Sequence, residues 1–451
     1  MSENELSMAR RIAEAAAAEG GRAYFVGGFV RDRLMGRENK DIDIEVHRVS
    51  VETLTRILGE LGEPLLMGAS FGVMGLRHYE LDVAMPRSET ATGRGHRDFA
   101  VSVDPFLGEE RAAQRRDFTI NALMENVLTG EIVDGFGGLR DLREGVLRHV
   151  SDESFAEDPL RVLRCAQFAA RFGFTVADET AALCGRMDLS SLAKERVMDE
   201  LEKALLKAAA PSVFFETLRR MGQLSVWFPE LERTVGIPQS PRFHAEGDVW
   251  THTMLVTDAA AALRDGADKP LALLLAALTH DFGKAVCSQT VDGQIHNYGH
   301  ETLGLPLAEA FLRRLTNEKA LIETVLNLVE NHMRPNILAA DRASVKATNR
   351  MFDRSADPEA LILLAVADRR GSLPLREADS AFLYERLGVY REYMSRPHVT
   401  GRDLIGAGVP PSERFSGYLD CAHKLRLAGV PKENALRQTL ALARKQGDMK
   451  G

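Results

Sequence analysis

A change in hydrophobic periodicity near residue 154 constrains the fold of this chain most strongly. Before that point, short apolar runs alternate with helical patterns, and Gly, Asn and Asp residues separate them. After it, apolar residues recur at helical spacing and strand signals stop. The sequence therefore predicts an α+β fold, with a small N-terminal α/β head around a mixed sheet and an all-helical remainder. Strands are expected at residues 23–26, 42–46, 79–83 and 131–133.

The chain is long enough for several domains, because it has 451 residues and single hydrophobic cores stop growing near about 250–300 residues. Breaks that contain proline divide the helical part near residues 229, 238–241, 335 and 410–411. We predict a head at residues 1–150, a helical body at 151–238, a histidine-rich helical domain at 239–376 and a helical tail at 377–451.

The composition is typical of a folded globular protein. Hydrophobic residues make up 45% and charged residues 27%, which excludes disordered and collagen-like classes. The net charge of −8 disfavours a protein that coats itself nonspecifically with nucleic acid. Residues 401–451 nevertheless hold nine Lys or Arg against five Asp or Glu. This tail is either a contact for RNA phosphates or an ordinary solvated helix surface.

Cysteine spacing and the N-terminal segment indicate the cellular compartment. The four cysteines form no CxxC motif, so the sequence predicts neither a zinc ribbon nor a disulfide framework. The N-terminal segment lacks the apolar core of a signal peptide. The longest apolar run, residues 271–278, is far shorter than the about 20 residues that cross a bilayer. We expect a cytoplasmic protein with no membrane partner.

The head contains a glycine turn followed by a pair of carboxylates. Gly27 and Gly28 lie between a strand and a helical pattern, where a backbone can approach a phosphate and Arg31 can add a charged contact. Asp41 and Asp43 lie two residues apart on the next strand, so both side chains project from one face. Such carboxylates suit Mg²⁺. An isolated pair is more often an exposed strand edge, but its position after the glycine turn favours a metal site.

A second cluster opens the helical body. Pro159 is expected in the first turn of a helix, and Asp158, Arg161 and Arg164 are spaced by three, so they share one face. Asp accepts a hydrogen bond from the amino group of C or A, and Arg donates to ring acceptors, so this face can read a base edge. Taken alone, the motif is more often a salt bridge on a helix surface, which contributes little energy.

Together with residues 115–122 and 133–142, these motifs resemble the class II tRNA nucleotidyltransferase (CCA-adding enzyme) and bacterial poly(A) polymerase superfamily. The resemblance covers about residues 20–235. It implies that Asp41 and Asp43 are catalytic and hold Mg²⁺. It also implies a nucleotide-binding set in which the last three residues act as a protein template selecting CTP or ATP: Gly28, Arg31, Arg116, Asp158, Arg161 and Arg164.

Three further segments bear on that resemblance. Residues 195–201 resemble the family's helix-stabilising motif, which implies a structural role. Residues 87–112 resemble the flexible loop with which members change from C to A addition. Gln167 stands where several bacterial members carry a further Arg. Because Gln lacks the charge, we leave this position out of the site.

Histidines concentrate in the third expected domain, where six of the chain's twelve lie at residues 244–332. One of them, in His280-Asp281, ends an apolar helix at residues 271–279. A lone histidine is more often packed than ligating, but imidazoles and carboxylates from several helices can hold a divalent metal whose water attacks phosphate esters. The set resembles the HD-superfamily metal phosphohydrolases. That resemblance implies the metal ligands His252, His280, Asp281 and Asp368, with His300, His332 and Lys284 as further pocket residues.

The two resemblances together imply an enzyme that adds and repairs the 3′-terminal CCA of tRNA from CTP and ATP, with release of pyrophosphate. They imply a second activity of the phosphatase or 2′,3′-cyclic phosphodiesterase type. Four alternatives stay open: an enzyme that adds only CC or only A, a poly(A) polymerase, a protein uridylyltransferase, and an HD phosphohydrolase with an RNA-binding head. Intact Asp41 and Asp43 disfavour the last. The HD metal and the oligomeric state are left unassigned.

Overall fold

A computed structural model describes most of the chain. It divides into two compact units, the first holding Met1–Glu200 and Val213–Gln223, the second Leu201–Ser212 and Leu224–Gly451. The four domain boundaries predicted from the sequence remain predictions. The described residues are 3–39, 41–66, 73–91, 99–241, 244–374 and 378–449.

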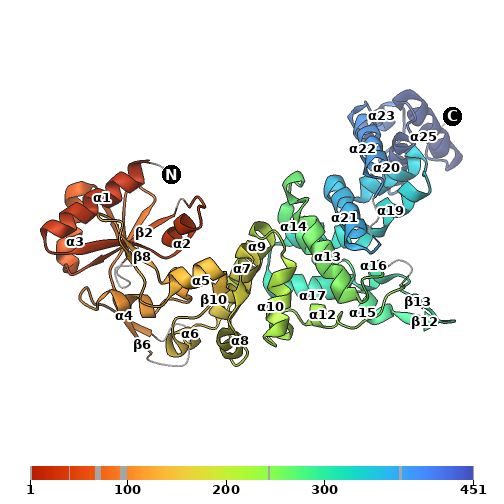
Figure 1. The fold of residues 1–451 in the computed structure, drawn as a ribbon. Coiled ribbons are helices and arrows are strands. Elements are labelled where there is room, and N and C mark those ends of the chain that lie inside the picture. The colour runs from red at the N-terminus through yellow and green to blue at the C-terminus, as the bar shows by residue number, and fades with distance from the viewer. Residues whose placement is uncertain are drawn as a thin grey trace. The chain divides into compact units, whose positions relative to one another are not determined.

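The first unit contains the predicted mixed sheet (Figure 1). Seven strands follow the order β3-β4-β5-β2-β1-β8-β9, in which β2 and β5 run parallel and the other neighbours antiparallel. All four expected strands are present, as β1, β2, β5 and β9, so the α/β head is confirmed. The sheet consists of β1 (Arg22–Val26), β2 (Ile42–His47), β3 (Pro64–Leu66), β4 (Val73–Leu76), β5 (Leu81–Ala84), β8 (Met124–Asn126) and β9 (Ile132–Val133).

Side chains along β2 separate a core face from a polar face. Ile42, Ile44 and Val46 are buried in one apolar cluster with residues of α1 (Glu3–Ala18) and α3 (Val51–Leu61). Burying one such side chain stabilises the fold by about 1.5–3 kcal/mol. Because side chains alternate along a strand, Asp43 and Glu45 project from the opposite face. The apolar cluster on one face of β2 thus fixes the position of Asp43 and Glu45 on the other face.

A hairpin and several short helices complete the head. β6 and β7 pair antiparallel within the loop predicted to be flexible. Gly93 and Gly95 of that loop lie outside the described residues. These elements are β6 (Arg87–Ala91), β7 (Phe99–Val103), α2 (Gly28–Leu34), α4 (Glu109–Gln114), η1 (Thr119–Asn121) and α5 (Gly138–Glu144).

The body is built around α7 (Leu160–Phe172). Asp158 precedes it, and its Oδ1 accepts a hydrogen bond from the Leu160 backbone N–H at 3.0 Å. The N-cap position itself is Pro159, which makes no side-chain cap hydrogen bond. The interior face of α7 is apolar, with Val162 and Leu163 fully buried. The neighbouring elements are α6 (Asp152–Ala156), α8 (Asp178–Cys184), α9 (Lys194–Lys207), α10 (Ser212–Arg220), β10 (Val146–Leu147) and β11 (Thr175–Val176).

The apolar helix α14 (Pro270–Thr279) lies in the core of the second unit. It packs against α13 (Val249–Ala261), α18 (Lys319–Asn331) and α21 (Pro358–Gly371). Among the described residues, the segment Pro270–Cys287 is long and apolar enough to cross a membrane, but 72% of it is buried, which favours a core helix. The other elements here are α11 (Leu224–Trp227), α12 (Pro229–Glu232), η2 (Arg264–Gly266), α15 (Lys284–Cys287), α16 (His300–Leu303), α17 (Leu305–Leu315), α19 (Met333–Ala340) and α20 (Val345–Arg354).

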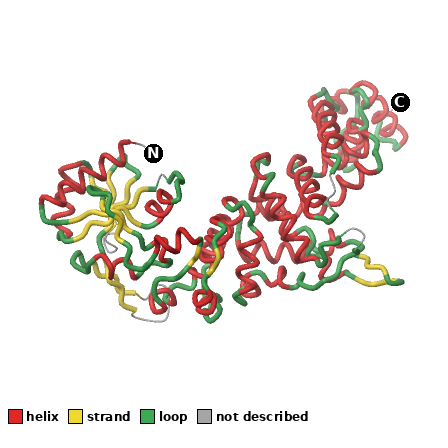
Figure 2. Tube along the Cα trace, viewed as in Figure 1, coloured by secondary structure: helices red, strands yellow, loops and turns green. Residues whose placement is uncertain are grey.

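The prediction of an all-helical remainder is wrong in two places (Figure 2). β11 pairs with β10 in the body, and β12 (Gln289–Val291) pairs with β13 (Gln294–His296) after α15. Asp292 and Gly293 join the hairpin with φ of 50° and 74°. Asp-Gly favours this two-residue turn. The strands are too short for an alternating pattern to reveal them.

The tail is helical, as predicted, and has an apolar cluster of its own that includes Val399, Leu404 and Tyr418. A capping box between Thr400 and Asp403 begins its second helix. The four helices are α22 (Ser380–Ser395), α23 (Gly401–Gly406), α24 (Phe415–Leu427) and α25 (Lys432–Lys445).

Candidate active sites

A polar cavity of about 490 Å³ opens on the acidic face of β2. One wall carries carboxylates of β2 and β5. Positively charged groups also line the cavity, from the arginines that follow α4 and from the N-terminal turn of α7. Four residues predicted from the sequence line it, together with one that was not predicted: Asp43, Arg116, Asp158, Arg161 and Asp82.

Asp43 and Asp82 are direct neighbours in the parallel register of β2 and β5. Burial, followed by the charge of Asp82, raises the pKa of Asp43 to about 6, and Arg116 opposes this rise. Asp41 precedes β2, is exposed, and donates its backbone N–H to Asn39 at 3.0 Å. A divalent cation would remove the repulsion between the carboxylates of Asp43 and Asp82, so this oxygen-rich set fits a hard metal ion.

The glycine turn lies against the same cavity wall. Gly27 has φ of 66°, and a Cβ there would come within 2.9 Å of the Arg116 guanidinium. The absence of a side chain therefore lets Arg116 pack over the turn. Gly28 is the first residue of α2. Arg116 lies 3.7 Å from Glu45, which holds its guanidinium beside the acidic strand.

Arg31 and Arg164 are in a different environment from the cavity. Arg31 is 4% exposed and donates to Asn121 Oδ1 at 2.7 Å. Asn121 in turn donates to Asp117 at 2.8 Å, and Arg164 donates to the other oxygen of Asp117 at 2.6 Å. Both guanidinium groups also lie over the Phe168 ring. The structure thus places them in a network that joins α2 to α7, and their nucleotide contacts stay predictions.

Asp158 and Arg161 are each held by groups of the body. Asp158 Oδ2 accepts from Arg196 at 2.8 Å. Arg161 donates to the backbone carbonyls of Ser154 and Arg115 at 2.5 and 2.8 Å. Arg196 lies in the segment predicted to be structural. It bonds directly to Asp158, which connects that segment to the cavity, and its structural role stays a prediction.

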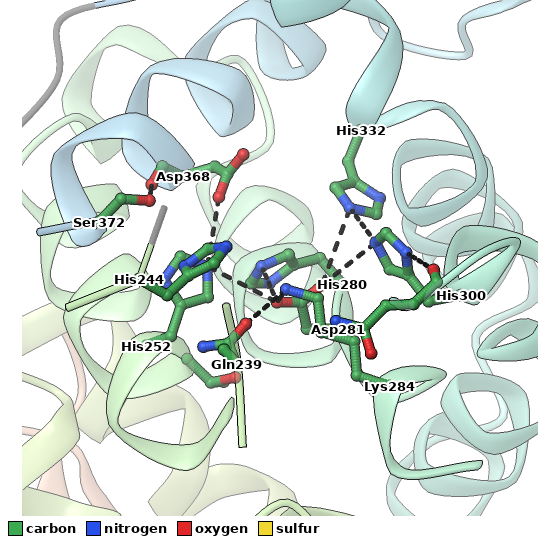
Figure 3. A network of polar contacts seen from close by, with 12 residues as sticks. Gln239, His244, His252, His280, Asp281, Lys284, His300, His332, Asp368 and Ser372 are labelled. Atoms are coloured by element: carbon green, nitrogen blue, oxygen red, sulfur yellow. Dashed lines mark hydrogen bonds and ion pairs between the residues drawn. The ribbon is translucent and has the colours of Figure 1, made fainter. Parts of the chain in front are cut away.

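The histidine-rich region forms one buried cluster from several helices (Figure 3). Asp281 lies at its centre. Its Oδ2 is 3.2 Å from His280 Nε2, and its Oδ1 is 3.3 Å from His300 Nε2. Two further contacts flank Asp281. His252 Nε2 lies 3.2 Å from Asp368, and His300 Nε2 lies 3.2 Å from His332 Nε2.

Asp281 belongs to two groups whose ligand atoms lie within 4.8 Å of one another. One group adds His252 and His280, and the other adds His300 and His332. Four buried imidazoles around one carboxylate provide the mixed nitrogen and oxygen donors that transition metals prefer. The whole set predicted from the sequence is therefore brought together.

The local chain geometry depends on Gly283. A Cβ at this position would lie 2.0 Å from the backbone oxygen of His300, so glycine is required for α16 to approach the His280-Asp281 turn. Lys284, 7% exposed in its side chain, lies 2.6 Å from Asp281 and donates to Gln239 at 2.6 Å. It therefore contacts the cluster through Asp281, and its role as a pocket residue stays a prediction.

The electrostatics of the cluster fit a metal ion. Burial lowers the pKa of His252, but hydrogen bonds with Asp368 and Glu246 outweigh it and raise the pKa to about 9. The carboxylates of Asp368 and Glu246 thus favour positive charge on His252, and a divalent cation can supply that charge instead of a proton. Burial, with His280 and His300 nearby, lowers the pKa of His332 to about 3, so that imidazole is neutral and can ligate.

Family models match three segments of the chain. A Poly A polymerase head domain matches residues 23–148, a probable RNA and SrmB-binding site of polymerase A matches residues 173–234, and an HD domain matches residues 249–371. The multifunctional CCA protein of Pasteurella multocida is 37% identical over 399 residues, covering 85% of this chain and 91% of that protein. The chain belongs to this family. The Alkalilimnicola ehrlichii member is 38% identical over 86% of this chain and 92% of its own length.

Solved structures of CCA-adding enzymes share the fold of this family member. The Thermotoga maritima CCA-adding enzyme complexed with tRNA has a TM-score of 0.66 at 20% identity and covers 98% of this chain and 96% of its own. A CCA-adding enzyme in complex with ATP has a TM-score of 0.69 at 19% identity, covering 99% and 95%.

Three residues of these two sites were missed from sequence. Asp82 sits between apolar residues of an expected strand, which is a detectable signal once that strand is paired with β2. Arg196 and Glu246 look like ordinary charged residues of a helix and a loop. Only their tertiary partners, Asp158 and His252, reveal them.

Proposed function

We propose that this protein adds and repairs the 3′-terminal CCA of tRNA, using CTP and ATP and releasing pyrophosphate. The cavity supports this most directly, because Asp43 and Asp82 lie in the same cavity as Asp158 and Arg161. It joins groups suited to a nucleotide's phosphates with groups suited to its base. Relatives named multifunctional CCA proteins, at 37–38% identity, support the same activity.

The reaction forms a bond between the tRNA 3′ oxygen and the nucleotide α-phosphorus and breaks the bond to pyrophosphate. We assign Asp41 and Asp43, with Asp82 beside them, to hold Mg²⁺, which would neutralise charge on the attacking and leaving oxygens. Arg116 is placed to contact the phosphates. Asp158 accepts from the amino group of C or A, and Arg161 donates to the ring acceptors. The chain then positions the reactants and requires no covalent intermediate.

The HD cluster is proposed to hydrolyse phosphate esters such as 2′,3′-cyclic phosphates. His252, His280, Asp281 and Asp368 would hold one divalent metal, which supplies an acidic water as nucleophile. His300 and His332, with Asp281, would hold a second. Lys284 is positioned to bind the substrate phosphate, because it extends from the same turn as Asp281.

The alternatives that add only CC, only A, or many A residues have the same head chemistry. A tRNA that ends at its discriminator base distinguishes them when CTP and ATP are supplied separately and together. Addition of C, C and A in that order is expected, and CTP alone should give two additions. Unlimited A addition, or no incorporation, would contradict the proposed activity.

A further inference from the structure

Four histidines point Nε2 into the HD cluster, and three of them fix the other ring nitrogen in the same way. Nδ1 bonds to the backbone carbonyl three residues earlier in the chain. Such a bond selects the tautomer that leaves Nε2 free for a metal. The distances are 2.8 Å for His280 to Ala277, 2.9 Å for His300 to Asn297 and 2.6 Å for His332 to Val329.

His252 is the exception among these four. Its Nδ1 lies 3.0 Å from a carboxylate oxygen of Glu246, a residue outside the set predicted from sequence. The Glu246 side chain is 1% exposed, and the same oxygen accepts from His244 Nδ1 at 2.8 Å. Its other oxygen accepts the Leu373 backbone N–H at 2.8 Å. A buried carboxylate thus uses both oxygens in hydrogen bonds.

The bond to Leu373 connects two ligand-bearing elements of the second unit. His252 lies on α13, and Asp368 lies on α21, whose last residue is two positions before Leu373. The backbone N–H of Ala245 also donates to the Leu373 carbonyl at 2.9 Å. The loop before α13 is therefore fastened to the segment after α21 by one backbone bond and one carboxylate bond.

We propose that Glu246 is a positioning residue for the HD metal site. It holds His252 in the tautomer that presents Nε2 and keeps His252 at the correct distance from Asp368. A carboxylate acceptor also makes the imidazole a stronger donor than a carbonyl does. This inference rests on the proposed metal site and concerns its assembly. Within this proposal, the shared Glu246 oxygen serves as the acceptor for both His244 and His252.

The test measures metal affinity of the full-length protein. Metal-free wild type, Glu246→Gln and Glu246→Asp are titrated with Co²⁺ against a competing chelator, and the visible spectrum reports the coordination geometry. Glu246→Gln keeps the volume but replaces one of the two acceptor oxygens with an NH2 donor. Either the two imidazoles or the Leu373 N–H then loses its acceptor, so affinity should fall about 10–100-fold. Glu246→Asp should recover part of the loss. Glu230→Gln is the matched control, since Glu230 is buried and bonded to Arg314, and it should bind as wild type.

Several outcomes would overturn this role. Unchanged Co²⁺ affinity and spectrum in Glu246→Gln would do so, as would an equal loss in Glu230→Gln. If wild type bound no Co²⁺, the HD metal site of the proposed function would itself fail, which is a separate result. A measurement on wild type avoids any folding defect: ¹⁵N-histidine NMR of the Zn²⁺-loaded protein should show His252 protonated at Nδ1, with the signal assigned by its loss in His252→Gln. Protonation at Nε2 would refute the proposal.

Discussion

The two sites of this protein differ in how completely the chain assembles them. In the head, Asp41 is exposed, Asp43 and Asp82 repel each other across neighbouring strands, and Asp158 and Arg161 line an open cavity. In the HD cluster, every imidazole nitrogen that faces away from the centre is already bonded. The two sites therefore differ in preorganisation, since the head carboxylates still repel each other, whereas the HD imidazoles are already oriented.

The largest expected effect separates the two activities. Asp43→Asn should reduce nucleotide addition by about 10³-fold, because loss of a metal-bridging carboxylate removes about 4 kcal/mol of transition-state stabilisation. Hydrolysis of a 2′,3′-cyclic nucleotide by the same preparation should be unchanged. Asp281→Asn should show the reverse pattern, since Asp281 contacts both metal groups. Labelled CTP incorporation and conversion of the cyclic nucleotide to its nucleoside monophosphate measure the two reactions side by side.

Two results would contradict the assignment of separate activities to the two sites. If either substitution removed both activities from a protein with a wild-type thermal transition, the two sites would not be independent. If both left addition intact, the head cavity would not be the transferase site.

The head motifs were predictable because they are local. A strand places residues two apart on one face, so the sequence predicts that Asp41 and Asp43 project together. The structure begins β2 at Ile42 and leaves Asp41 exposed before it, so only Asp43 of this pair lies on the strand and lines the cavity. Asp82 depends on the parallel register of β2 and β5, which joins residues far apart in the chain. Arg31 looked like a phosphate contact beside a glycine turn, yet tertiary packing against Phe168 and Asn121 buries it.

The HD ligands were predictable from residue type, and their supports were not. His280-Asp281 at the end of an apolar helix is a strong local signal, confirmed by α14 and the turn that follows it. Glu246 lies in a loop whose role appears only when its carboxylate meets His252 and Leu373. The β12–β13 hairpin was missed for a related reason, since its one clear signal was the Asp292-Gly293 pair.

Asp82→Asn sharpens the comparison from the head side. Removing this charge should lower the pKa of Asp43, because the carboxylate of Asp82 helps to raise it. Asp43 is then more fully ionised and a better metal ligand by itself, but the site has one carboxylate fewer to bind the metal. We expect addition to fall about 10²-fold at fixed Mg²⁺ and to recover partly at higher Mg²⁺. If the rate of Asp82→Asn did not depend on Mg²⁺ concentration, Asp82 would have no part in metal binding.

Gly283→Ala tests how rigidly the HD site is preassembled. The new Cβ would meet the His300 backbone oxygen at 2.0 Å, so α16 must move away from the turn. Overpacking of this kind costs about 1–3 kcal/mol, equivalent to a Tm decrease of roughly 2–10 °C. Co²⁺ affinity should fall with it. Gly27→Ala in the head meets the flexible end of Arg116, and its φ of 66° adds backbone strain of about 1–2 kcal/mol. We therefore expect a higher KM for the nucleotide with a Tm decrease no larger than that of Gly283→Ala and with unchanged Co²⁺ affinity. Equal effects of the two would remove the distinction between the sites.

Arg196→Gln should give the smallest effect and the most specific one. Arg196 fixes one oxygen of Asp158 at 2.8 Å, while the Leu160 N–H holds the other, so the carboxylate should remain near the cavity but turn more freely. We expect selection of CTP over UTP to weaken about tenfold, which corresponds to roughly 1.4 kcal/mol, while kcat with CTP changes little. Arg10→Gln, which removes an exposed i,i+4 pair with Glu14, is the control. A general loss of kcat without any loss of discrimination would assign Arg196 to the fold of the body, because a purely structural residue has no reason to distinguish one pyrimidine from another.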